Sequence, residues 1–301
     1  GTEELALTGG LFTDMSLTNL SVPGTEEGDA AGLLLEHVVD AQVSGLTIAN
    51  VTGGRGKPGG FGAGVLLRST SACVVSALDV TNVVGGTATY QGSASPHVAA
   101  AGGVGAGIAV LDSMACELDG NTVVGATGGW GGTSGGASSG ATGGVGAGVY
   151  LRATSACLLD ANTISAVVGG EGGGGYQVSV GAAQQGFGIF LEPDAEANTI
   201  ADTNTVEGDA IVYLYGVTGV TVEDYVLTAY ANPTNLGKIV VLESAGVQIL
   251  NNQVENFVAA SACPVSTYCS FGTDGAIGAG IRIRGCSACS ASGNTIAGIT
   301  G

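Results

Sequence analysis

The cysteines are the residues of this chain whose spacing most directly predicts chemistry. Four of them close copies of one short pattern, in which the second Gly of a Gly-x-Gly lies nine residues before the last Cys. Cys is readily buried as a small apolar side chain, so we expect these four to occupy one inward position of the core. They are Cys73, Cys116, Cys157 and Cys289.

Two further cysteine spacings have other meanings. Cys263 and Cys269 are near enough in sequence to close a small disulfide loop, which favours an oxidising, extracellular compartment. Cys286 and Cys289 form a Cys-x-x-Cys pair, a spacing shared by zinc sites and redox centres. Because no second pair or histidine accompanies it, the spacing alone assigns neither function.

Carboxylates and arginines are the candidates for metal or acid–base chemistry. Asp119 and Asp160 hold equivalent positions in neighbouring copies of the pattern and could share a Ca²⁺ ion. Two carboxylates fall short of the about six to eight oxygen ligands that Ca²⁺ takes, so no cofactor is assigned. Opposite charges also recur at one outward position, where we expect them to pair across strands rather than to catalyse. These pairs are Glu36 with Arg68 and Arg152 with Glu192.

The composition limits the partners and the fold class. There are 25 acidic and 7 basic residues, a net charge of −18, whereas a nucleic-acid surface needs a basic stripe, so nucleic acid is excluded. Only 11% of residues are charged, 45% are hydrophobic and 56 are Gly, which predicts a folded core with little helix. No run of 18 apolar residues predicts a membrane-spanning segment, and no signal segment opens the chain, so we expect a mature or trimmed extracellular or cell-surface protein.

An internal repeat positions these residues. Four segments superimpose without gaps, beginning at Gly62, Gly105, Gly146 and Gly278, and degenerate copies fill the gaps between them. Equivalent positions lie from 22 residues (188 to 210) to 43 residues (64 to 107) apart. The excess always falls in a Gly-rich stretch before the next Gly-x-Gly. Insertions confined to one corner are typical of a solenoid, in which each coil must still stack on its neighbours.

Within each copy the apolar residues alternate with a period of two, as in strands packed on one face. In one copy, Val149 and Leu151 are expected to point inward from a first strand, Cys157 and Leu159 from a second, and Ile164 from a third. The prediction is therefore an all-β parallel solenoid of about eight three-strand coils with Gly-rich loops at one corner. It forms a single domain over 1–301, with a lead-in over 1–11 and the repeat array over about 12–301.

This arrangement resembles the right-handed parallel β-helix superfamily, which includes pectate lyases, polygalacturonases and many bacterial surface proteins. The resemblance implies a column of Asn side chains inside the turn between the second and third strands, each amide bonding its neighbours above and below. Leu46 and Leu78 replace Asn in the first two copies, and Asp224 nearly matches the column. The matching residues are Asn121, Asn162, Asn204, Asn252 and Asn294.

The resemblance also allows an enzyme, because lyases and hydrolases of this superfamily bind polysaccharide on the outer face of the first strand. A lyase would need several acidic groups for Ca²⁺ and a basic Arg or Lys, and a hydrolase a pair of carboxylates. The outward positions of that strand are mostly apolar, so no catalytic residue is assigned. The segment from Gly280 to Arg284 is slightly similar to the Arg-Ile-Lys motif of polygalacturonases, but their accompanying motifs are missing.

The apolar outward residues lie beside the long Gly-rich loops. We expect the loops to fold back and bury Leu66, Tyr150 and Phe190 as a second layer, because glycine lets backbones approach closely. The alternative is that the loops are mobile linkers. Trp130 in a loop is expected either to anchor the loop on that layer or to be an exposed ring that stacks on sugars, and we favour the anchor.

The repeat carries no cap at either end, and uncovered strand edges can pair with identical chains end to end. The expected function is an extracellular structural or adhesive protein, such as a surface fibre, sheath or adhesin stalk, that self-associates into a filament. Two alternatives stay open: a polysaccharide lyase or hydrolase, and a non-catalytic carbohydrate-binding module that uses loop aromatics and contacts a cell surface.

Overall fold

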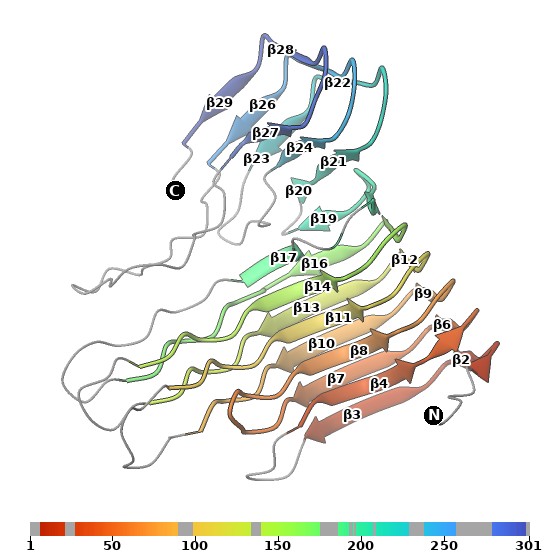
Figure 1. The fold of residues 1–301 in the computed structure, drawn as a ribbon, viewed down its shortest axis with the longest axis vertical. Helices are drawn as coiled ribbons and strands as arrows, with labels where there is room; N and C mark the ends of the chain where they lie inside the picture. Colours follow the sequence, from red (N-terminus) through yellow and green to blue (C-terminus); the bar gives the residue numbers. More distant parts are fainter. Residues whose placement is uncertain are drawn as a thin grey trace.

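The structure is a computed structural model in which every regular element of the described residues is a β-strand (Figure 1). All strand pairs are parallel except one. The described residues are 7–21, 28–89, 99–133, 140–174, 186–192, 195, 197–206, 209–228, 238–256 and 279–298.

The first stack contains three parallel sheets whose strands follow one another in chain order. The first sheet contains β4 (Ala30–Glu36), β8 (Gly62–Arg68), β11 (Gly105–Leu111), β14 (Gly146–Arg152) and β17 (Gly186–Leu191). The second contains β2 (Leu11–Thr13), β6 (Gln42–Ser44), β9 (Val74–Ser76), β12 (Glu117–Asp119), β15 (Leu158–Asp160) and β18 (Thr199–Ile200). The third contains β3 (Ser16–Ser21), β7 (Thr47–Thr52), β10 (Asp79–Val84), β13 (Thr122–Thr127), β16 (Thr163–Ser165) and β19 (Thr205–Val206).

One strand from each sheet makes a coil, which is named below by its strand in the first sheet. A short additional pair joins β1 (Leu7–Thr8) to β5 (Val38–Val39). In the β14 coil, Val149, Leu151, Cys157, Leu159 and Ile164 are all buried in one core cluster, as the alternation predicts. The predicted all-β parallel solenoid is therefore confirmed.

A second stack repeats this plan, drawn in blue-green to blue in Figure 1. Its first sheet contains β21 (Val212–Tyr215), β24 (Ile239–Leu242) and β27 (Ile281–Arg284). Its second contains β22 (Thr221–Glu223), β25 (Gln248–Leu250) and β28 (Ser290–Ser292). Its third contains β23 (Val226–Thr228), β26 (Gln253–Glu255) and β29 (Thr295–Ala297).

The strand ladders break between the two stacks. The 22-residue spacing between positions 188 and 210 fits one coil without an insertion. However, β20 (Asp209–Ala210) pairs antiparallel with β19, so the chain reverses there. The two stacks still share apolar packing, because Tyr213 and Val240 belong to the same core cluster as Ile189 and Leu191. The outer face of β21 and β24 thus covers the last coil of the first stack.

Next to the break, the register differs by one residue from the one that the sequence repeat predicts. Val212 pairs with Ile239, so position 211, and not 210, is equivalent to 238. A slip of one residue moves a side chain to the opposite face of a sheet. Val212 is therefore buried in the core of the second stack, and Tyr225, rather than Asp224, holds the position of the Asn column.

Candidate functional site

The buried asparagines of the first stack form a continuous hydrogen-bonded ladder. The Nδ2 of Asn121 donates to Oδ1 of Asn162 at 2.9 Å, and Nδ2 of Asn162 donates to Oδ1 of Asn204 at 2.8 Å. Each Oδ1 also accepts the backbone N–H of the coil before it, as Asn162 does from Asn121 at 3.1 Å. The second amide hydrogen of Asn162 reaches the carbonyl of Leu118 at 2.8 Å. Since these groups are buried, each bond satisfies a polar group that water cannot reach.

The second stack has a separate asparagine pair. Asn252 donates from Nδ2 to Oδ1 of Asn294 at 2.9 Å, and Tyr225 donates its backbone N–H to Oδ1 of Asn252 at 3.0 Å. The five asparagines predicted to form one column therefore lie in two ladders. The break between the stacks separates Asn204 from Asn252, because the chain reverses at β20.

Two further ladders were missed in the sequence. Asn50 donates to Asn19 at 2.9 Å and Asn82 donates to Asn50 at 2.7 Å on the exposed side of the third sheet. The sequence does contain a pattern that marks this ladder, because each of these Asn residues lies two residues after an inward apolar residue of its strand. The second ladder lies in the turn after the first strand, where the Oγ of Ser113 accepts the backbone N–H of Thr70 at 2.9 Å.

Three cysteines stack at one inward position of the first stack. Cys73, Cys116 and Cys157 are free thiols buried in neighbouring coils. The hydrogen bond with the Cys116 thiol, together with burial, raises the pKa of the Cys73 thiol well above its ordinary value. In the next coil Asn198 takes this position, and its Oδ1 accepts the backbone N–H of Cys157 at 3.0 Å. The hydrogen bond between Cys116 and Cys157 raises the pKa of the Cys116 thiol and lowers that of Cys157. All three thiols lie within the apolar core.

Cys289 is not part of that column. It lies in the β27 coil of the second stack and forms a disulfide with Cys286, three residues before it. The position of Cys289 is equivalent to that of the buried Val247, so the prediction of an inward side chain holds while the predicted stack of cysteines does not include it. Cys263 and Cys269 lie outside the described residues.

The Gly-rich loops form a hydrogen-bonded layer over the corner of the first stack. Each loop leaves the third sheet and returns to the first, and glycines of the leaving and returning segments alternate in one chain of bonds. From the second glycine of this chain onward, each amide donates to the carbonyl of the glycine before it, at 2.7 to 3.0 Å. The chain is Gly28, Gly54, Gly60, Gly86, Gly103, Gly129, Gly144 and Gly170.

Close approach, rather than a left-handed backbone, requires glycine in this layer. A Cβ on Gly144 would overlap the carbonyl oxygen of Gly103, and one on Gly103 would overlap that of Gly60. Neither glycine has a positive φ. These segments are therefore not mobile linkers within the described residues, and their composition follows from how tightly the backbones pack.

A second apolar core lies on the outer face of the first sheet. Leu66, Ala109 and Tyr150 point outward from neighbouring strands and are buried, with Phe61 packed against them. The ring of Tyr150 stacks on that of Phe190 at a centroid distance of 5.6 Å. The structure thus places Leu66, Tyr150 and Phe190, the residues expected under the loops, in one outer core.

A scan against models of protein families gives no match, and a search of curated proteins gives none either.

Charged residues on the outer face of the first sheet bond to one another. Arg68 contacts Asp29 at 2.8 Å and Glu36 at 3.3 Å, so the predicted pair with Glu36 is present and Asp29 joins it. Glu192 accepts a hydrogen bond from the hydroxyl of Tyr150 at 2.7 Å, where pairing with Arg152 was predicted. The charged groups are all at least partly exposed, so each ion pair contributes little to stability, whereas Tyr150 donates from a buried position.

Trp130 does not anchor its loop. Its side chain is 59% exposed, while its backbone carbonyl accepts the N–H of Ala88 at 2.8 Å inside the glycine layer. The anchoring prediction is wrong because glycine backbone bonds, rather than the indole ring, hold this loop in place. The exposed ring is left available for stacking on a flat apolar partner.

The carboxylates considered for Ca²⁺ lie in register but recruit no further ligands. Asp119 and Asp160 pair across β12 and β15, and Asp160 accepts a hydrogen bond from the Thr203 hydroxyl. Within the described ranges, no group of three or more His, Cys, Asp or Glu could hold a metal ion. Among the same residues, no helix is long and apolar enough to cross a membrane.

Proposed function

We propose that this chain is an extracellular structural or adhesive protein of the right-handed parallel β-helix superfamily that assembles end to end into a surface filament or sheath. The observation that supports the proposal is how the polar and sulfur-containing side chains are used. Amides, hydroxyls and thiols of successive coils bond to one another, as Asn121, Asn162 and Asn204 do. Such ladders rigidify a rod, and glycine backbone bonds reinforce its corner.

The strand edges support assembly between copies. Within the described residues, β27, β28 and β29 are edge strands of the second stack, and β2, β3 and β4 are edge strands of the first. The β27 coil leaves the inward positions Ile283 and Ile296 exposed, and at the opposite end Met15 is exposed and Phe12 and Leu17 are only partly buried. Pairing of these two edges between identical chains buries both apolar sets and generates an open filament.

The test is the mass and shape of the purified chain at increasing concentration, by sedimentation velocity and negative-stain microscopy. Wild type is expected to form rods longer than one molecule, and Ile296→Lys, which places a charge on the exposed edge, is expected to remain monomeric. Val124→Lys is the matched control, because Val124 is similarly exposed but lies on the outer face of the third sheet. Monomeric wild type at every concentration would exclude the filament.

A second candidate function is supported by Trp130. Exposed aromatic rings stack on sugars, so the chain is also a candidate carbohydrate-binding module. Binding to a panel of acidic and neutral polysaccharides that disappears in Trp130→Ala would favour this module. New reducing ends or unsaturated sugars released from the same panel would instead favour a hydrolase or lyase and contradict the structural function.

The extracellular or cell-surface location is part of the proposal. It is supported by the Cys286–Cys289 disulfide, because disulfides persist in oxidising compartments. Its test is accessibility of the chain on intact cells to an impermeant labelling reagent, compared with a cytoplasmic control protein from the same cells.

A further inference from the structure

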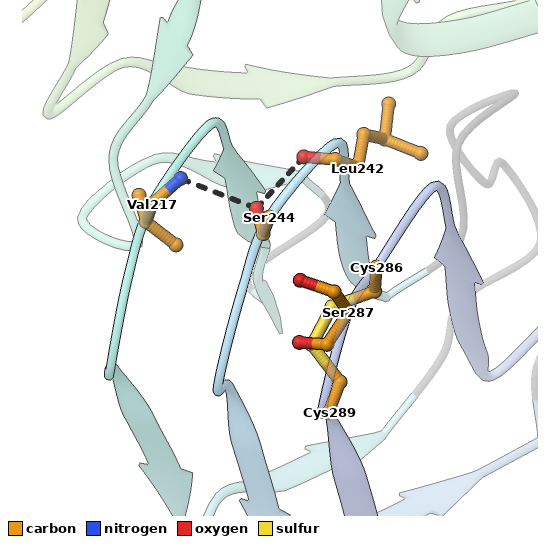
Figure 2. Close-up of a disulfide and its surroundings, with 6 residues drawn as sticks. All are labelled: Val217, Leu242, Ser244, Cys286, Ser287 and Cys289. Atoms are coloured by element: carbon orange, nitrogen blue, oxygen red, sulfur yellow. Dashed lines mark hydrogen bonds between the residues drawn. A yellow bond between two sulfur atoms is a disulfide. The ribbon is translucent and has the colours of Figure 1, made fainter.

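The Cys286–Cys289 disulfide lies in the turn between β27 and β28 of the second stack. Figure 2 shows the two sulfur atoms joined across this turn, with Ser287 between them and the turns of two neighbouring coils beside it. The Cα atoms are 5.9 Å apart, which is an ordinary separation for a disulfide. The bond closes a very small loop, so the chain entropy that it removes from the unfolded state is small.

The repeat explains why these two side chains meet. Cys286 is equivalent to Ser244 in the β24 coil, because Ser287 is bridged to Ala245. In that coil the Oγ of Ser244 accepts the backbone N–H of Val217 at 3.2 Å (Figure 2). The same turn position holds Thr70, Ser113 and Thr154 in the first stack, each three residues before an inward cysteine. Among the described coils, only the β27 coil has cysteine at both positions.

The surroundings of this pair differ from those of the other described cysteines. Cys73, Cys116 and Cys157 are covered by coils on both sides and are fully buried. Cys286 and Cys289 are half-buried, and the two residues between them are exposed. The β27 coil is the edge of its stack within the described residues, so no described coil covers the sulfur atoms.

The coil does not depend on the disulfide for its position. The backbone N–H of Ser287 donates to the carbonyl of Ser244 at 3.0 Å, and that of Ser290 donates to Val247 at 2.9 Å. Three parallel strand pairs also hold the coil to its neighbour. Reduction therefore leaves these contacts in place and can be reversed in the folded protein.

We propose that the Cys286–Cys289 pair is a thiol–disulfide exchange site whose substrates are exposed thiols of small molecules or proteins. A substrate thiolate attacks one sulfur, forms a mixed disulfide with it and releases the other cysteine as a thiolate, which takes up a proton. A second substrate thiol resolves the mixed disulfide. The pair gains two electrons and two protons, and the two substrate thiols become one disulfide.

The test is peptide-resolved labelling of the native chain. Limited dithiothreitol followed by N-ethylmaleimide is expected to label Cys286 and Cys289, whereas the three buried cysteines of the first stack need urea before they react. The circular dichroism of the reduced chain is expected to match that of the oxidised chain, and oxidised glutathione should restore the disulfide. Labelling of the pair only in urea, or loss of strand signal on reduction, would overturn the proposal.

A variant tests whether the sulfur of Cys289 is accessible, separately from whether the disulfide can be reduced. Cys286→Ser leaves Cys289 as a single thiol, which is expected to react with N-ethylmaleimide without any reductant. If Cys289 stays unlabelled in the folded variant, its sulfur is not accessible and the exchange site is excluded. Because the labelled peptides are read separately, Cys263 and Cys269 do not obscure the result. Repeating the labelling in the Ile296→Lys background, which is expected to remain monomeric, keeps the outcome separate from end-to-end pairing of the β27 coil.

Discussion

Replacing Asn162 by Leu tests the buried ladder at its centre. Asn162 is 0% exposed, and its side chain bonds to Asn121, Asn204 and the carbonyl of Leu118. Leu fits the column sterically, because Leu46 and Leu78 fill the same position in the β4 and β8 coils. The substitution therefore removes hydrogen bonds without creating a clash.

The expected loss follows from the groups that lose their partners. The backbone N–H of Asn121 and one of its amide hydrogens become buried without a partner, at about 1–3 kcal/mol each. Burial of the Leu side chain returns about 2 kcal/mol. The net loss in the free energy of unfolding is therefore about 2 kcal/mol, measured by urea unfolding followed by far-UV circular dichroism.

The exposed ladder supplies the matched control. Asn50 makes two amide bonds to neighbouring coils, but in solvent, and its φ of 57° suits glycine. Asn50→Gly is expected to lose no more than about 1 kcal/mol, because water replaces the broken bonds. A loss for Asn162→Leu below about 1 kcal/mol, or equal losses for both variants, would refute the reasoning.

Two further predictions concern the glycine layer and two buried weak acids, the phenol of Tyr213 and the thiol of Cys73. Gly144→Ala is expected to lower the melting temperature by several degrees, because the added Cβ would overlap backbone atoms. Gly174→Ala is the control and is expected to have no effect, because the atom nearest to its added Cβ lies at 3.8 Å. Equal melting temperatures for the two variants would contradict the packed layer. Burial raises the pKa of Tyr213 to about 12, and the pKa of Cys73 is raised by the Cys116 thiol and by burial. Both groups keep their protons in the folded chain where the unfolded chain releases them, so stability is complete below about pH 9 and falls as the pH rises from there. Urea unfolding between about pH 8 and pH 11 measures this fall, and Tyr213→Phe should reduce it above about pH 10; a free energy of unfolding that rises over this range would contradict it.

The regular part of the fold could be predicted because the repeat is locally explicit. The Gly-x-Gly, the Cys nine residues later and the Asn five residues beyond it fix register in the copies around Cys116 and Cys157. Period-two alternation then assigns the inward side chains, and the structure places Val149 and Ile164 as expected. The burial of the outer face of the first sheet could also be predicted, because glycine has no Cβ and lets the neighbouring loop backbones approach closely.

The break between the stacks could not be predicted in the same way. The copy near Val212 lacks the Gly-x-Gly and the Asn, so nothing local distinguished two registers that differ by one residue. The reversal at β20 depends on contacts between distant residues, such as Tyr213 with the core around Ile189. The exposure of Trp130 was missed for a related reason, because backbone bonds that hold its loop leave no pattern in side-chain type.

Amide hydrogen exchange of the Gly-rich segments tests most directly whether the loops are a bonded second layer of a rigid solenoid. The amides of Gly86, Gly103, Gly129 and Gly144 each donate to a glycine carbonyl at 2.7 to 2.8 Å. Their peptides are predicted to exchange as slowly as those of the neighbouring strand β13, with protection that is lost only on global unfolding. Exchange at the rate of an unstructured chain, alongside protected strands, would contradict the layer and the rigid rod built on it.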